Sequence, residues 1–118
     1  MSTQDAEERL ELLQGTLDLL ILRTLLLGAQ HGQGIARGIQ QTSQKELLVE
    51  HGALYPALQR LEERGWIAAK WGTSSSNRRA RFYSLTPIGR KQLAKETTKW
   101  QRLVAAIGRV LEAEPARG

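Results

Sequence analysis

The spacing of apolar residues predicts that helices occupy the first half of the chain. At 51–64, leucines recur at positions i, i+4 and i+7, which is the period of a helix with one buried face, and Gly65 follows as a stop. Thr16 is suited to cap an earlier, strongly apolar helix, with Asp18 in its first turn and Gly28 at its end. The expected helices are 5–13, 16–27, 34–42 and 51–64, with turns at 28–32 and 43–50.

After Gly65 the pattern changes to a hairpin followed by one long helix. Phe82 and Tyr83 lie in an alternating segment and are expected on opposite faces of a strand. Thr86 followed by Pro87 is a signal for a helix start, because a hydroxyl caps the helix and proline suits its first position. The expected elements are strands at 66–71 and 80–85, a polar loop at 72–79 and a helix at 87–112.

This order of elements predicts a mainly α fold with an α+β wing. Three short helices and a basic hairpin are typical of a winged helix-turn-helix, in which one helix enters the DNA major groove and the hairpin contacts the backbone or minor groove beside it. We expect residues 1–86 to form the N-terminal helix and the DNA-binding module, and residues 87–118 to form a dimerisation helix and tail. Both segments belong to one structural domain, since 118 residues suffice for one modest core.

The composition narrows the class of protein further. Hydrophobic residues make up 41% of the chain and charged residues 25%, as in soluble globular proteins. The absence of cysteine excludes disulfides, thiolate nucleophiles and the common zinc sites, and it fits a reducing cytosol. His31 and His51 have no third ligand at metal spacing, and the serines at 74–76 have no His/Asp pattern of a hydrolase. We therefore expect no enzyme activity, no metal and no cofactor.

The hydropathy of the chain does not indicate a signal peptide or a membrane span. The N-terminus is acidic, unlike a signal peptide, and the most apolar stretch, residues 17–27, is about half the length of a bilayer span. We expect a cytoplasmic protein without a membrane partner.

The charge is concentrated. The formal net charge is +5, but residues 60–102 alone carry eleven basic and three acidic side chains, whereas residues 1–19 carry five acidic and one basic. A concentrated positive charge favours a polyanionic partner such as nucleic acid.

Several short motifs resemble the PadR family of bacterial transcriptional regulators. They are GTL at 15–17, GALYPAL at 52–58, LEERGWI at 61–67 and YSLTPIG at 83–89. The resemblance covers about residues 12–111 and is to the family's compact branch, which implies a winged helix-turn-helix with a single C-terminal dimerisation helix. Two positions depart from the family pattern: Glu50 stands where a Ser or Thr cap is common, and Ile35 follows Gly34 where the family often has tyrosine.

The resemblance implies that Tyr55 contacts the DNA backbone; the alternative is a tyrosine half-buried against the wing. Gln59 is suited to adenine and Arg60 to guanine by bidentate geometry, but Arg60 equally suits a solvated or salt-bridged position. Arginines on the polar loop suit phosphates or a minor groove, and a solvated loop is the alternative. The candidate DNA-binding residues are Gly52, Ala53, Tyr55, Gln59 and Arg60 in the helix, and Ser75, Ser76, Asn77, Arg78, Arg79 and Arg81 in the wing.

The last helix carries a long apolar stripe. Leu93, Trp100 and Ile107 are seven residues apart, and the stripe exceeds what packing against one small domain requires. We interpret it as a dimer seam, which would suit a pseudo-palindromic operator; burial under the N-terminal helix is the alternative. The candidate dimerisation residues are Leu10, Leu13, Leu93, Trp100, Leu103, Val104, Ile107, Val110 and Leu111.

Trp100 has a second interpretation. Multidrug-responsive members of the compact branch carry a tryptophan at the same distance after the Leu-Thr-x-x-Gly motif. The resemblance implies that Trp100 faces its counterpart across the dimer and binds planar aromatic or cationic effectors, through the apolar and cation-attracting face of an indole. The alternative is a tryptophan that fills the seam.

The predicted function is a sequence-specific regulator of transcription that binds double-stranded DNA as a homodimeric repressor and is released by a small-molecule effector. Two alternatives come from other classes. One is a non-specific architectural nucleic-acid-binding protein, and the other is a protein-interaction module that uses the winged fold for dimerisation only.

Overall fold

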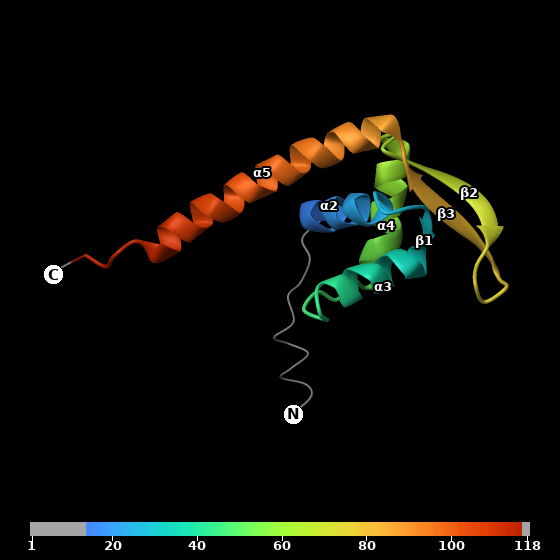
Figure 1. The fold of residues 1–118 in the computed structure, drawn as a ribbon, viewed down its shortest axis with the longest axis horizontal. Helices are drawn as coiled ribbons and strands as arrows, with labels where there is room; N and C mark the ends of the chain where they lie inside the picture. The colour runs from blue at the N-terminus through green and yellow to red at the C-terminus, as the bar shows by residue number, and fades with distance from the viewer. Residues whose placement is uncertain (1–13, 117–118) are drawn as a thin grey trace, which may run out of the picture.

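The computed structural model describes residues 14–116 (Figure 1). In chain order its elements are α2 (Gln14–Leu25), β1 (Gln30–His31), α3 (Gly32–Thr42), α4 (His51–Glu63), β2 (Ile67–Thr73), β3 (Arg79–Leu85) and α5 (Pro87–Glu112). The strands form one antiparallel sheet in the order β1-β3-β2, and the β2–β3 hairpin extends beyond the helices as a wing. The predicted mainly α fold with a winged helix-turn-helix is confirmed.

The core lies where α2, α3 and α4 meet and continues beneath the first turns of α5. Ile21 and Leu22 of α2, Ile35 of α3 and Leu58 of α4 are fully buried. Burial of each such side chain stabilises the fold by about 1.5–3 kcal/mol. Leu93 joins this core from α5, and beyond it α5 runs out past the body of the protein (Figure 1).

The junction between the wing and α5 explains the Leu-Thr-x-x-Gly motif. The Thr86 hydroxyl oxygen accepts the Gly89 N–H at 3.0 Å, and the hydroxyl donates to the Gly65 carbonyl at 2.7 Å. A Cβ at Gly89 would overlap the Trp66 carbonyl oxygen, so only glycine lets α5 start this close to β2. The helix predicted at 87–112 is found with those bounds.

The start of α2 differs from the prediction. The helix is already formed at Gln14, so Thr16 lies inside it and caps nothing. Asp18 is consequently beyond the first turn, and its carboxylate meets α4 instead. The helix ends at Leu25, two residues before the expected position. The helix predicted at 5–13 lies outside the described residues.

The start of α3 also differs. The pattern predicted a turn at 28–32, but Gln30 and His31 form a short strand that pairs with Tyr83 and Phe82 of β3. The His31 Nδ1 then accepts the N–H of Gly34 at 3.1 Å and caps α3, which therefore begins two residues before the predicted start. A two-residue strand has no periodicity of its own, so only its pairing with β3 creates it.

The wing is longer than predicted and its loop is shorter. The strands extend to Thr73 and from Arg79, which reduces the loop to 74–78. The Ser74 N–H donates to the Arg78 carbonyl at 2.7 Å, and Asn77 adopts a φ of 61°. Asparagine tolerates this left-handed conformation better than most residues, so the tip of the wing is a defined turn.

Candidate DNA-binding surface

The exposed face of α4 is set by the burial of its opposite face. Its apolar side chains at every third or fourth position point into the core: Leu54, Ala57, Leu58 and Leu61. Residues between them face solvent, and these include four of the five predicted recognition residues: Gly52, Ala53, Tyr55 and Gln59. Glu50, the poor cap noted in the sequence, makes no side-chain capping bond. The Glu50 carbonyl accepts the N–H groups of Ala53 and Leu54, so the first turn of α4 is closed by backbone bonds without a capping side chain.

Tyr55 is 45% exposed and leans on the start of α3. A Cβ placed on Gly32 would approach the Tyr55 ring to 2.9 Å, so the glycine makes room for the ring. The His51 ring meets it edge-on at 6.0 Å. The Tyr55 ring is half-buried against α3 rather than against the wing, and its other side stays open toward the wing; its contact with DNA stays a prediction.

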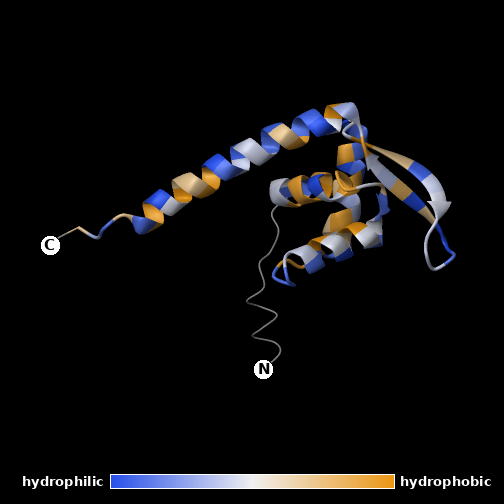
Figure 2. Cartoon of the chain, viewed as in Figure 1, coloured by the Kyte–Doolittle hydropathy of each residue, from blue (hydrophilic) through white to orange (hydrophobic). Residues whose placement is uncertain are grey.

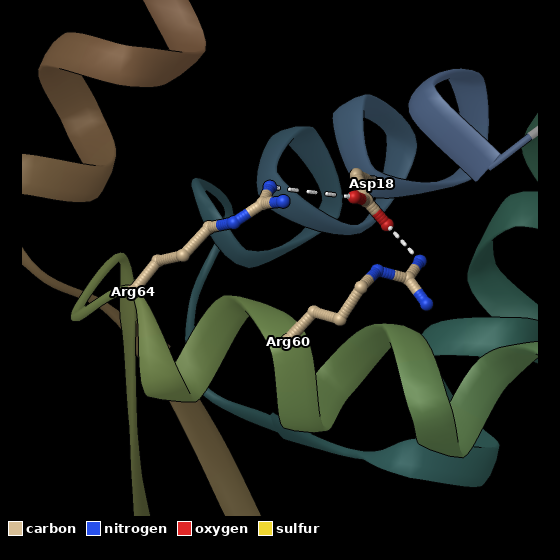
Figure 3. Close-up of polar contacts among 3 residues, drawn as sticks. All are labelled: Asp18, Arg60 and Arg64. Carbon is tan, nitrogen blue, oxygen red and sulfur yellow. Dashed lines mark hydrogen bonds and ion pairs between the residues drawn. The ribbon is translucent and has the colours of Figure 1, made fainter.

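Arg60, the fifth predicted recognition residue, turns toward α2 (Figure 3). Its Nη2 donates to the Asp18 Oδ1 at 2.8 Å, while the Arg64 Nη1 lies 3.9 Å from the Asp18 Oδ2. Asp18 is 7% exposed, and the Arg60 Nε is buried as well. This geometry matches the salt-bridged alternative for Arg60. A contact between Arg60 and DNA remains an untested prediction.

Two of the wing arginines, Arg79 and Arg81, contact neighbouring side chains. The Arg79 guanidinium lies 4.9 Å from the centroid of the Trp71 ring, and Trp71 is 56% exposed. The Arg81 Nη2 forms an ion pair with the Glu62 Oε2 at 2.8 Å, which ties the wing to α4. Sequence reasoning missed Trp71 as a support for Arg79. Strand alternation could have predicted this contact. Trp71 pairs with Arg81 across the hairpin, and Arg79 lies two residues before Arg81, so all three side chains share one side of the sheet.

The helix and the wing meet in a groove of about 360 Å³. Residues from α3, α4 and β3 line it, among them Gly32, Tyr55, Arg79, Arg81 and Tyr83. Burial raises the pKa of the Tyr83 phenol, against an opposing effect of the Arg81 guanidinium, so the phenol is neutral at neutral pH. The groove therefore combines two arginines with the neutral Tyr83 phenol, which suits a phosphate backbone.

Wing-tip residues complete the predicted set. Ser75, Ser76, Asn77 and Arg78 are all exposed in the five-residue loop. Their side chains carry no apolar anchor, so the tip offers only polar and cationic groups to a partner.

The apolar stripe of α5 lies away from this surface (Figure 2). Leu93 is 6% exposed and belongs to the core of the protomer, so the exposed part of the stripe begins at Trp100, contrary to the predicted place of Leu93 in a seam. The exposed stripe comprises Trp100, Leu103, Val104, Ile107, Val110 and Leu111. Leu10 and Leu13 lie outside the described residues.

Trp100 borders a groove of about 670 Å³ between α5 and the start of α2. Gly15 and Leu19 line it from α2, and Leu103 and Arg109 line it from α5. The indole is 44% exposed. The lining of the groove mixes apolar and charged side chains.

Two other kinds of feature are absent from residues 14–116. No helix in this range is long and apolar enough to cross a membrane. The same residues contain no cluster of three or more His, Cys, Asp or Glu side chains that could hold a metal ion.

An exposed helix face beside an arginine-bearing hairpin, both carried by a helix-turn-helix, defines a winged-helix DNA-binding protein. Comparison with known families agrees. The model of the Transcriptional regulator PadR-like family matches residues 21–95, and the chain belongs to that family of DNA-binding regulators of transcription.

Individual relatives cover most of the chain. It is similar to a PadR family transcriptional regulator from Eggerthella lenta, with 26% identity, a TM-score of 0.73, and coverage of 96% of this chain and 93% of that one. A transcriptional regulator from Clostridium thermocellum has 27% identity and a TM-score of 0.74, with coverage of 81% and 93%. An uncharacterized protein X from Lysinibacillus sphaericus is 27% identical over 88% of this chain and 95% of its own length.

Proposed function

We propose that this regulator is a cytoplasmic, sequence-specific, homodimeric repressor. Helix α4 enters the major groove of a pseudo-palindromic operator, and the wing follows the adjacent backbone. One observation carries the proposal: Tyr55 on the exposed side of α4 and the wing residues Arg79 and Arg81 line a single groove, whereas the apolar stripe of α5 lies elsewhere. DNA binding and assembly therefore use separate surfaces.

The proposal of a homodimer is based on the exposed part of α5. Six large apolar side chains stay open to solvent there in one protomer, with Val110 and Leu111 at 75% and 77% exposure. A contiguous apolar stripe on a protruding helix is typical of an interaction site. A second copy presents the same stripe, so two α5 helices bury it by symmetry. Residues 87–118 then serve dimerisation, and residues 1–86 serve DNA binding.

The proposal of an effector is based on the groove at Trp100. A planar aromatic or cationic compound stacks on the indole, while the alternative remains that a partner helix fills the space. A ligand that favours one spacing of the two DNA-binding modules shifts the population away from the operator-bound form.

Footprinting on the promoter of the protein's own gene and of its neighbours tests the function. We expect protection of an inverted repeat whose half-sites are about one helical turn apart. Competition with random DNA should show a specificity ratio of roughly a thousandfold or more. Equal affinity for random DNA would instead indicate an architectural protein, and no DNA affinity would indicate a protein-interaction module.

A further inference from the structure

The exposed face of α4 contains no cationic side chain. The residues of α4 that face solvent are His51, Gly52, Ala53, Tyr55, Pro56, Gln59 and Glu63. Arginine and lysine are the side chains that most often read guanine in the major groove. The only arginine in α4 is Arg60, so its position decides whether the helix can use that contact.

Arg60 is withheld from this face by Asp18 of α2 (Figure 3). The Arg60 Nη2 and Asp18 Oδ1 are 2.8 Å apart and the Arg60 Nε is buried, while 27% of the side-chain surface stays exposed, so the ion pair holds the guanidinium toward α2. Asp18 is 7% exposed and cannot turn to water for a substitute partner. If Arg60 moved into the DNA major groove, the buried Asp18 carboxylate would lose its shorter ion pair, which is costly. Arg64 makes the longer of the two ion pairs to Asp18, at 3.9 Å from the other carboxylate oxygen.

The groups that remain on the exposed face favour A·T base pairs. The Gln59 amide has one acceptor and two donors, which match N6 and N7 of adenine in a bidentate pair. Ala53 and Pro56 present only apolar surface, which suits the methyl group of thymine. The His51 ring is packed edge-on against Tyr55, and Glu63 lies at the far end of the helix from the first turns that reach base edges.

We propose that α4 selects half-sites dominated by A·T pairs, that Gln59 reads an adenine in them, and that Asp18 sets this preference by keeping Arg60 out of the groove. The inference deepens the proposed function and rests on α4 being the recognition helix. It assigns Asp18 a positioning role, because the carboxylate acts through Arg60 and touches no DNA.

The test is selection from a random pool of double-stranded oligonucleotides by the full chain, followed by sequencing of the bound fraction. We expect the wild type to enrich half-sites in which the pairs beneath α4 are A·T. In Gln59→Ala, discrimination at one adenine should fall roughly tenfold or more, because a bidentate contact is lost. Gln41→Ala is the matched control, since Gln41 is equally exposed but lies at the end of α3 away from the wing.

Two further variants test the role of Asp18. Asp18→Asn weakens the hold on Arg60 and keeps the shape of the side chain. We expect it to bind random DNA more tightly at low salt, with a slope of log affinity against log salt that steepens by about one unit per protomer. The double variant Asp18→Asn/Arg60→Gln removes both charges and keeps a hydrogen-bonding pair, so it should fold and retain the wild-type A·T preference. Thermal unfolding followed by circular dichroism checks that each variant is folded.

The outcomes separate this inference from the function beneath it. Enrichment of a G·C pair that disappears in the double variant would mean that Arg60 reads guanine, and it overturns the inference alone. An A·T preference that survives Gln59→Ala unchanged overturns the role of Gln59. A pool with no enriched sequence overturns sequence-specific binding, and this inference falls with it.

Discussion

Single residues in this protein act mainly by what they exclude. Asp18 pairs with the Arg60 guanidinium between α2 and α4, and Gly32 leaves space for the Tyr55 ring. Gly89 does the same for a backbone carbonyl at the start of α5. In each case the side chain, or its absence, decides where a larger group can lie.

We expect Gly89→Ala to destabilise the protein by about 1–3 kcal/mol or more, because the added methyl group overlaps the Trp66 carbonyl and backbone must move. The measurement is the free energy of unfolding in urea. Gly108→Ala is the matched control in the same helix: nothing lies within 4 Å of a Cβ there, so alanine should be neutral or stabilise by up to about 1 kcal/mol. Equal stability of the two variants would contradict the tight junction.

At the scale of elements, side-chain contacts of two arginines hold the wing hairpin in place. The Arg79 guanidinium rests on Trp71, and Arg81 is tied to Glu62 of α4. These contacts hold two cationic side chains on the side of the sheet that faces the groove beside Tyr55. Side chains that are already ordered lose less entropy when they bind, so these contacts would lower the entropic cost of the phosphate contacts proposed for the wing.

The triple variant Arg78→Ala/Arg79→Ala/Arg81→Ala should weaken binding to all DNA sequences similarly. It should also flatten the slope of log affinity against log salt by roughly one unit per lost phosphate contact per protomer. Fluorescence anisotropy of labelled DNA at several salt concentrations measures both effects.

A matched control removes the same charge elsewhere. The variant Arg90→Ala/Lys91→Ala/Lys95→Ala takes three exposed cations from α5, and we expect a smaller change in slope. If the wing variant and this control behave alike, the wing arginines do not touch phosphates and only net charge matters.

The whole molecule consists of a compact body and a protruding helix. The body spans α2 to β3 and buries the core, whereas most of α5 extends beyond it (Figure 1). Beyond Leu93, no side chain of α5 is buried in one protomer. Assembly is therefore the property that the overall shape most directly predicts.

We expect the protein to sediment at micromolar concentration as a species of about twice its 13.2 kDa mass. Leu103→Glu/Ile107→Glu should yield a monomer with weakened DNA affinity, because charge enters the apolar stripe and the two modules lose their linkage. Thr98→Glu/Gln101→Glu adds the same charge to exposed positions outside the stripe and should leave the assembly intact. A wild-type protein that sediments only as a 13.2 kDa species would contradict the proposed dimer.

Planar aromatic cations should quench tryptophan fluorescence with micromolar affinity, and Trp100→Ala should abolish the response. The reason is that the indole borders an open groove and attracts both aromatic rings and cations. Trp66 and Trp71 remain in the variant and serve as internal controls, since both lie toward the wing. Quenching that persists without Trp100, or the failure of any such compound to bind, would remove the effector site and leave DNA binding unaffected.

The sequence by itself determined the elements whose signals are local. The cap at Thr86, the proline after it and the stop at Gly65 are read within a few residues, so α5 and α4 were predicted nearly to the residue. The alternation around Phe82 predicted the hairpin, and the period of the leucines in α4 predicted which face would be exposed. These signals survive because helix caps, turns and amphipathic faces depend on neighbours along the chain.

Only the tertiary structure decided the contacts between distant segments. Asp18 and Arg60 are 42 positions apart, and no local pattern pairs them. The strand at Gln30 exists because β3 lies beside it, and Leu93 is in the core because the junction at Thr86 aims α5 across α2. The physical reason is common to all three: a pairing across space depends on where whole elements pack, and a single sequence records those elements but not their mutual placement.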